Sequence, residues 1–146
     1  MHMNRILVID DEQAVREAIA RRLQREEHEV VIAATEADGI AHLRESDPAF
    51  DVVLTDMLME TPASGVNVLR AALMRDVFTE VVVLTAYGSV KNAVECMKLG
   101  AFDYVEKNIP EVDVLELLCL KVQQAIERRA AALVTVRKLE RAKEFA

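Results

Sequence analysis

Short apolar runs alternate with longer stretches of helical periodicity along most of the chain. Five runs rich in Val, Ile and Leu are nearly continuous in apolar residues, as expected of strands buried on both faces of a parallel sheet. They lie at residues 5–9, 29–33, 51–54, 80–84 and 102–105. Since parallel strands require right-handed crossovers, the alternation predicts an open α/β sheet with helices on both faces.

Between the strands, apolar residues recur at helical spacing, and turn residues mark the helix ends. The helices are expected within residues 13–26, 35–43, 66–73 and 89–99. Thr35 and Ser89 are good N-caps for the second and fourth of them. Gly100 is expected to end the fourth helix, because glycine adopts the conformation that closes helices most easily.

From about Glu111 the chain has the pattern of a single helix to its end, well beyond the ~12 residues of an average helix. Apolar residues follow a heptad pattern, which Arg129 interrupts at a core-type position; its members are Leu115, Val122, Val136, Leu118, Ala125, Ala132 and Leu139. We expect the first half to pack on the sheet and the second half to project as a coiled-coil-like stalk. Residues 1–125 would form the domain and residues 126–146 its helical extension.

Composition narrows the possible functions. With 146 residues, 52% of them apolar, the chain suits one globular domain with an appendage. Its net charge of −7 argues against direct nucleic-acid binding. Cys96 and Cys119 have no metal-ligand spacing and are expected to be reduced thiols in or near the core. No signal peptide or membrane span is evident, so a cytoplasmic protein is expected.

Polar residues gather where the predicted strands end. Asp10-Asp11 follow the first strand, Asp56 the third, Thr85 the fourth and Lys107 the fifth. The carboxyl ends of parallel strands meet at one edge of such a sheet, where ligands bind. Three carboxylates, a hydroxyl and an ammonium are therefore expected at one site.

This set predicts a Mg²⁺-dependent phosphoryl-acceptor site. Neighbouring carboxylates repel one another unless a cation joins them, and Mg²⁺ prefers oxygen ligands. Mg²⁺, Lys107 and Thr85 could neutralise phosphoryl oxygens while Asp56 acts as the nucleophile. Taken singly, each residue has a simpler role: Asp10 or Asp11 as a helix cap, Asp56 in a turn, Thr85 at a strand end, and Lys107 as a solvated charge.

The runs ILVIDDE and DVVLTDMLM, the Thr85-Ala86 pair and Lys107 after a strand resemble bacterial response-regulator receiver domains. The resemblance covers about residues 4–125. It implies a flavodoxin-like (βα)5 sheet with strand order 2-1-3-4-5 and a sensor histidine kinase as phosphoryl donor. It also implies regulation of signalling, with transcription as the expected output.

Residue by residue, the resemblance assigns four positions to the acceptor and the metal. Asp56 matches the phosphoacceptor, and Asp10 and Asp11 match the acidic pair that holds Mg²⁺. The backbone carbonyl of Leu58 matches a further metal ligand. Asp11 would bind the ion directly and Asp10 more often through water.

Three more positions match the residues that respond to the phosphoryl group. Lys107 matches the lysine that pairs with its oxygens, and Thr85 the switch hydroxyl that turns toward it. Tyr104 matches the aromatic residue that changes rotamer with that hydroxyl. The implied consequence is a remodelled face made by the fourth helix, fifth strand and fifth helix.

The segment TAYGSVKNAVECMKLGAFDYVEK resembles the nitrogen-regulatory subgroup, which controls σ54-dependent activators. In that subgroup a long helix after the receiver belongs to a dimer linker leading to an ATPase domain. Homodimerisation through the switching face and the C-terminal helix is therefore expected here. Arg129 at a core-type heptad position indicates a modest or conditional dimer.

Two features depart from the family pattern. Asn108 follows Lys107 where the family usually has proline, often after a cis bond. A non-proline bond prefers trans by about 2.5–4 kcal/mol, which could change the aim of Lys107. Glu60 stands where proline is common, and the loop before Gly65 is one residue longer than usual. An extra acid there could weaken phosphoryl retention or simply face water. We favour the interpretation that the Glu60 side chain faces water.

Two other functions fit part of the pattern. A Mg²⁺-dependent phosphatase or phosphotransferase would also use an aspartyl nucleophile, but usually has a catalytic aspartate two residues later, where this chain has Leu58. A degenerate receiver would act as an interaction module without phosphorylation. The intact acidic set argues against that alternative, whereas the altered loop after Lys107 keeps it open.

Overall fold

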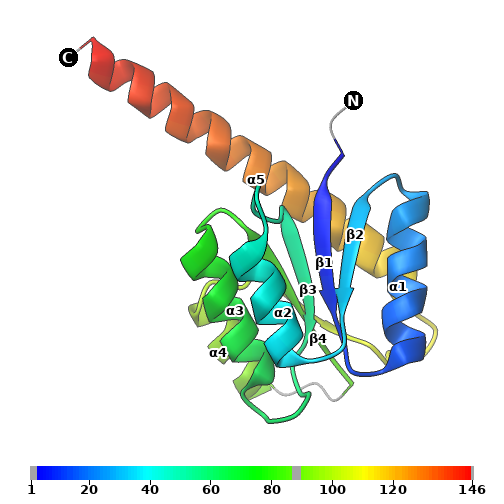
Figure 1. Cartoon of the computed structure of the whole chain (residues 1–146). Coiled ribbons are helices and arrows are strands. Elements are labelled where there is room, and N and C mark those ends of the chain that lie inside the picture. The colour runs from blue at the N-terminus through cyan, green and yellow to red at the C-terminus, as the bar shows by residue number, and fades with distance from the viewer. Residues whose placement is uncertain (1–2, 87–89, 146) are drawn as a thin grey trace.

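Five parallel strands form the centre of the protein in the order β2-β1-β3-β4-β5, in a computed structural model that describes residues 3–86 and 90–145 (Figure 1). The strands are β1 (Arg5–Ile9), β2 (Glu29–Ala33), β3 (Val52–Asp56), β4 (Glu80–Thr85) and β5 (Asp103–Glu106). In register, Leu7 lies opposite Val31 on one side and Val53 on the other. The predicted fold class and strand order are confirmed.

Five helices connect and follow the strands. They are α1 (Gln13–Arg25), α2 (Glu36–Glu45), α3 (Ser64–Arg75), α4 (Val90–Lys98) and α5 (Val114–Glu144). The Thr35 hydroxyl accepts a hydrogen bond from the Asp38 amide, which confirms it as the cap of α2. Gly100 has φ +106° after α4, which confirms its role as a helix stop. Ser89 lies outside the described residues.

Alternate residues of each strand supply two separate cores. Leu7 and Ile9 of β1 pack in the cluster that contains Leu69 of α3 and Cys96 of α4. Ile6 and Val8 pack with Leu23 of α1 and with Leu118 and Val122 of α5. Because both faces are covered, the strands need apolar residues at every position, which explains their nearly continuous apolar runs. Cys96 is buried, Cys119 is half-buried, and both are free thiols, as expected.

Some element boundaries differ from the sequence-based ones. β3 extends to Asp56, which pairs in register with Leu84, and β4 extends to Thr85, which pairs with Glu106. These polar residues are thus held by the sheet ladder and do not lie in loops. α5 begins at Val114, because Glu111 has φ +65° and the Asp113 carboxylate caps the helix by accepting from the Glu116 amide.

The first half of α5 packs on the sheet and the second half projects away from it (Figure 1). Leu118, Val122 and Ala125 are buried, whereas Val134 and Leu139 are about half exposed, at 45% and 59%. The packing and the projecting stalk are therefore confirmed. Among the described residues, no helix is both long and apolar enough to cross a membrane.

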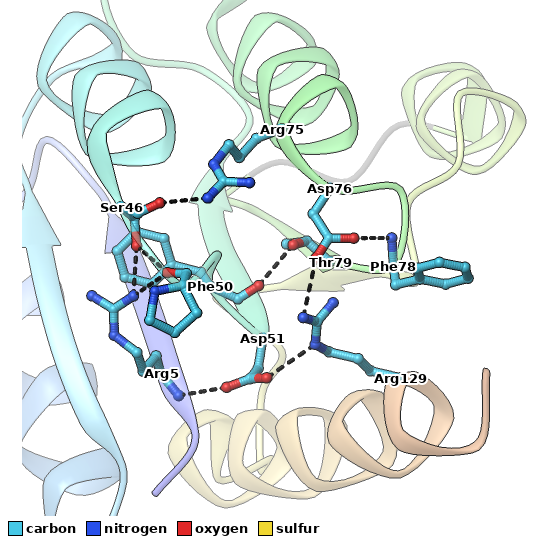
Figure 2. Close-up of polar contacts among 10 residues, drawn as sticks. Arg5, Ser46, Phe50, Asp51, Arg75, Asp76, Phe78, Thr79 and Arg129 are labelled. Carbon is cyan, nitrogen blue, oxygen red and sulfur yellow. Dashed lines mark hydrogen bonds and ion pairs between the residues drawn. The ribbon is translucent and has the colours of Figure 1, made fainter. Parts of the chain in front are cut away.

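Arg129 fastens α5 to the domain at the amino-terminal edge of the sheet (Figure 2). Its Nε lies 3.0 Å from Asp51 Oδ1, and its Nη2 lies 3.1 Å from Asp76 Oδ2. The second oxygen of Asp51 accepts from the Arg5 amide at 2.7 Å. The core-type heptad position of Arg129 is therefore held by a side chain that is only 12% exposed and is bound by its own domain.

Replacing Arg129 with alanine is expected to destabilise the domain. The change leaves Asp51 and Asp76 without the cation that separates them, and removing one partner of a partly buried ion pair costs about 2 kcal/mol or more. Urea unfolding measures the difference. Arg137→Ala, at an exposed stalk position, is the matched control and should change stability by less than ~0.5 kcal/mol. Equal effects of the two substitutions would contradict the proposed anchoring role.

Candidate functional site

Four carboxylates meet at the carboxyl-terminal edge of the sheet. One ligand oxygen from each of Asp10, Asp11, Glu12 and Asp56 can be chosen so that all lie within 4.8 Å of one another. Asp56 is the last residue of β3, and the other three directly follow β1, the neighbouring strand. The sheet order therefore assembles a group of acids from two segments that lie far apart in the sequence.

Lys107 enters this group from the end of β5. Its Nζ lies 2.5 Å from Asp10 Oδ2, 3.2 Å from Asp56 Oδ2 and 3.8 Å from Glu12 Oε1. The lysine side chain is only 7% exposed, and its backbone amide donates to the Thr85 carbonyl at 2.7 Å. The Lys107–Asn108 bond is trans, and the ammonium nevertheless reaches both aspartates. Lys107 thus contacts both aspartates without a proline after it.

Asp10 is fully buried and holds the group together from the inside. Its Oδ1 accepts from the Glu12 amide at 2.9 Å, which closes a tight turn after β1. Its backbone carbonyl accepts from Arg16 Nη1 at 2.8 Å. Neither Asp10 nor Asp11 is the N-cap of α1; Glu12 occupies that position without a side-chain hydrogen bond. The simple capping role is thus not what these two acids do.

Asp56 is 6% exposed, and its environment disfavours the charged form. Burial raises the pKa of its carboxyl to about 6, and the charges of Asp10 and Asp11 add to this, whereas Lys107 opposes it. Burial alone would lower the pKa of Lys107, but its hydrogen bonds to Asp10 and Asp56 and their charges raise it. Lys107 is therefore a stable ammonium, and one cation does not neutralise the group of acids.

Thr85 and Tyr104 lie on neighbouring strands beside this group. Thr85 is the last residue of β4 and is 2% exposed. Tyr104 pairs in register with Val83, and both belong to the core on the α3–α4 face of the sheet. Because side chains alternate along a strand, Thr85 shares that face with Val83 and Tyr104. The two residues expected to act together thus lie on the same side of the sheet.

The loop after Asp56 returns closely to the strand end. A Cβ at Gly65 would lie 2.8 Å from the Met57 Cα, so only glycine lets α3 begin this close to β3. The Gly65 amide donates to the Met57 carbonyl at 3.0 Å. Leu58, whose backbone carbonyl is the expected metal ligand, lies in this loop with its side chain 44% exposed.

Glu60 in the same loop is exposed and does not join the four carboxylates. Its carboxylate accepts from the Glu36 amide at 3.3 Å and from the Ser64 hydroxyl at 3.4 Å. The expectation that Glu60 faces water is therefore confirmed, with an added role at the amino terminus of α2. Negative charge is favourable there because free amides and the helix dipole point toward it.

Glu12 is the member of the site that sequence reasoning missed. Its carboxylate completes the group of four and lies 3.8 Å from the lysine ammonium. The feature of the sequence that could have indicated a role for Glu12 is its position directly after the Asp10-Asp11 pair. An exposed glutamate at the start of a helix is common, however, and only the fold turns this one toward Lys107.

The arrangement suits a hard divalent cation and an anionic group bound next to it. Carboxylate oxygens from two strand ends converge on one point, and such oxygens are the ligands that Mg²⁺ prefers. Lys107 and Thr85 come from the two strands beyond β3 and can face an anion held at Asp56. The geometry therefore combines acids that could hold a metal ion with a buried carboxylate and a positively charged partner.

Comparisons with known proteins agree with this arrangement. The response regulator receiver domain family matches residues 6–119. The acid tolerance regulatory protein ActR of Rhizobium meliloti is 33% identical over 122 residues, which cover 84% of this chain and 61% of ActR. The chain therefore spans less than two thirds of that relative.

Solved structures have the same fold. A receiver domain protein from Clostridium thermocellum has a TM-score of 0.79 and 32% identity, covering 89% of this chain and 99% of that one. NtrX from Brucella abortus, in complex with ADP, has a TM-score of 0.79 and 26% identity, covering 92% of this chain and 30% of that one. The chain belongs to the response regulator receiver domain family and resembles its nitrogen-regulatory, NtrC-type subgroup.

Proposed function

We propose that this chain is the phosphorylation-controlled receiver of a two-component system and accepts a phosphoryl group on Asp56 from a sensor histidine kinase. One observation carries the proposal: Asp56 is a buried carboxylate at the end of β3, 3.2 Å from the Lys107 ammonium and within a group of four acids. A buried acid with a raised pKa, next to a fixed cation, is typical of a functional site.

Mg²⁺ is the proposed cofactor, held by Asp10, Asp11, Asp56 and the backbone carbonyl of Leu58. The convergence of carboxylate oxygens within 4.8 Å supports this assignment. When bound, the ion would neutralise these acids and the phosphoryl oxygens. Glu12 is a further oxygen donor at the rim of the site, either to the ion or to a water on it.

The proposed transfer uses one oxygen of Asp56 as the nucleophile. The new bond joins that oxygen to phosphorus while the phosphorus–nitrogen bond of the kinase phosphohistidine breaks, and the bonding electrons return to the imidazole. Lys107 faces the phosphoryl oxygens as an ammonium, and the Thr85 hydroxyl donates to one of them. Both stabilise charge that develops during the transfer.

The site is proposed to store the phosphoryl group and not to turn over substrates. An aspartyl phosphotransferase needs a proton donor for its leaving group, and the position two residues after Asp56 is held by Leu58. No acid beyond the four that would face the metal joins the group among the described residues. The remaining chemistry is autophosphorylation from small donors and slow self-hydrolysis.

Phosphorylation is proposed to act through Thr85 and Tyr104 on the face formed by α4, β5 and α5. The two residues share one face of the sheet, and Tyr104 packs against the core beneath α4. An inward turn of Thr85 would open space for the tyrosine ring, and the added charge supplies the difference between the two states.

The stalk is proposed to link this domain, residues 1–125, to an output unit through residues 126–146. Apolar residues continue along the stalk after Arg129, where α5 no longer has its own domain to pack against. Pairing with a second copy through these apolar residues and through the face formed by α4, β5 and α5 would cover them. Control of transcription is the proposed output.

Incubation with Mg²⁺ and a small phosphodonor, followed by intact-mass measurement, tests the acceptor. The native chain is expected to gain one phosphoryl group, and Asp56→Asn is expected to gain none, because the amide cannot form the acyl phosphate. Asp47→Asn, at an exposed turn remote from the site, is the matched control and should be labelled like the native chain. Equal labelling of the native chain and Asp56→Asn would refute the assignment.

The raised pKa of Asp56 predicts a specific pH dependence without metal. The folded state binds the Asp56 proton more tightly than the unfolded state does, so this group costs stability as the pH rises from about 4 through 6. Between pH 5 and 7.5, the native chain should therefore lose about 1 kcal/mol of unfolding free energy relative to Asp56→Asn. Urea unfolding in EDTA measures this difference, and added Mg²⁺ should reduce it. A difference that does not change with pH would contradict the burial argument.

The switch predicts a linked response of two side chains. Beryllofluoride with Mg²⁺ mimics an aspartyl phosphate, and it should shift the NMR ring resonances of Tyr104 in the native chain. In Thr85→Ala the mimic should still bind, but the tyrosine response to it should be lost. The reason is that the hydroxyl whose turn toward the mimic is coupled to the ring position is absent. Thr135→Ala, at an exposed stalk position, serves as the control. Unchanged Thr85 and Tyr104 positions with and without the mimic would rule out the switch.

A further inference from the structure

A groove runs between α2 and α3 on the α3–α4 face of the sheet, where the two helices lie side by side (Figure 1). Its volume is about 490 Å³. Apolar side chains of Ile40, Ala71 and Met74 line it. From Glu36 to Arg44 it extends for about 12 Å along α2, or roughly two helical turns. The groove contains none of the residues assigned to phosphorylation.

Met74 gives the groove an exposed apolar end. Its side chain is 89% exposed, more than any other large apolar residue of the described sheet-and-helix body. Val77, three residues further along, is 70% exposed. Single exposed apolar residues are ordinary, but here an unbranched, adaptable side chain stands at the rim of a preformed groove. Such a side chain could pack on a partner at little cost in rearrangement.

Three arginines surround the apolar lining. Arg44, Arg70 and Arg75 are all exposed and line the groove. Within residues 3–86 and 90–145, none of them forms an ion pair; Arg75 Nη2 instead donates to the Ser46 carbonyl at 2.7 Å (Figure 2). Three exposed cations thus line one groove of a chain whose net charge is −7.

The opposite end of the groove is different in character. Glu36 lines it, and its carboxylate accepts from the side-chain Nδ2 of Asn67 at 3.3 Å. Positive charge is therefore concentrated toward the carboxyl ends of α2 and α3, next to Met74. A ligand with an apolar face along the groove and acids near its arginine-lined end would match this arrangement.

We propose that the α2–α3 groove is a docking site for an acidic amphipathic helix of a partner protein. A groove walled by two helices and about two turns long fits the apolar face of a third helix, with Met74 and Ile40 as the contact surface. The three arginines would pair with its acids and select its direction. Nucleic acid fits less well, because three cations on an acidic chain give few phosphate contacts and leave the apolar lining unused.

Titration with a synthetic peptide tests this proposal directly. The probe is a capped helix-forming peptide with leucines on one face and glutamates flanking them, and the control peptide has lysine at each glutamate position. Amide NMR shifts of the full chain should move along α2 and α3 with the acidic peptide, and not with the lysine peptide. No shift at millimolar acidic peptide, or shifts that lie elsewhere, would overturn the proposal.

Matched variants separate charge and apolar contributions from folding. Arg70→Glu should weaken binding of the acidic peptide about fivefold or more, since an attraction becomes a repulsion. Met74→Ala should also weaken it, whereas Arg137→Glu on the stalk should not. Arg70 is exposed and unpaired in the described part of the chain, so spectra outside the groove should stay unchanged. Equal effects of Arg70→Glu and Arg137→Glu would overturn the proposal.

Sedimentation and DNA titration examine the other possible occupants of the groove. If the native chain self-associates and Arg70→Glu is monomeric, the occupant is a second copy and the partner proposal is wrong. Tighter binding of duplex DNA than of the acidic peptide, lost in Arg70→Glu, would likewise overturn it. The native chain in the unphosphorylated state and the Asp56→Asn variant should bind the peptide equally, so failure here leaves the acceptor assignment unaffected.

Discussion

The burial of two carboxylates beside one ammonium is the constraint on which the site at the edge of the sheet depends. Asp10 and Asp56 are almost fully buried at the edge of the sheet, and a single ammonium, that of Lys107, lies between them. Burial raises the pKa of the Asp56 carboxyl, the charges of Asp10 and Asp11 add to this, and the single cation does not cancel these effects. Added positive charge at this site is therefore expected to stabilise the folded protein.

The opposite edge of the sheet has a different electrostatic arrangement. There Arg129 pairs with Asp51 and Asp76, and Arg128 Nε lies 3.2 Å from Glu80 Oε2. Two arginines pair there with three acids, and these contacts anchor α5 to the sheet. They hold the point where α5 leaves the domain.

Departures from the family pattern have local structural consequences and do not disturb the acidic site. Asn108 replaces a proline, yet the backbone amide of Lys107 bonded to Thr85 still directs the ammonium to both aspartates. Glu60 adds an acid to the loop after Asp56, but its carboxylate lies at the amides that begin α2. In each case a backbone contact supplied by a neighbouring segment determines where the side chain lies.

The sequence by itself determined the five strands, the helices, their order and the five strand-end residues, because these depend on local periodicity and on rules of chain connection. It also placed Thr35 and Gly100 correctly, since caps are local. Tertiary structure alone decided the partners of Arg129, which lie 78 and 53 residues away. The same holds for Glu12 beside Lys107, for Glu60 at α2, and for the arginine-lined groove. Such contacts join side chains whose distance in space cannot be read from their spacing in the chain.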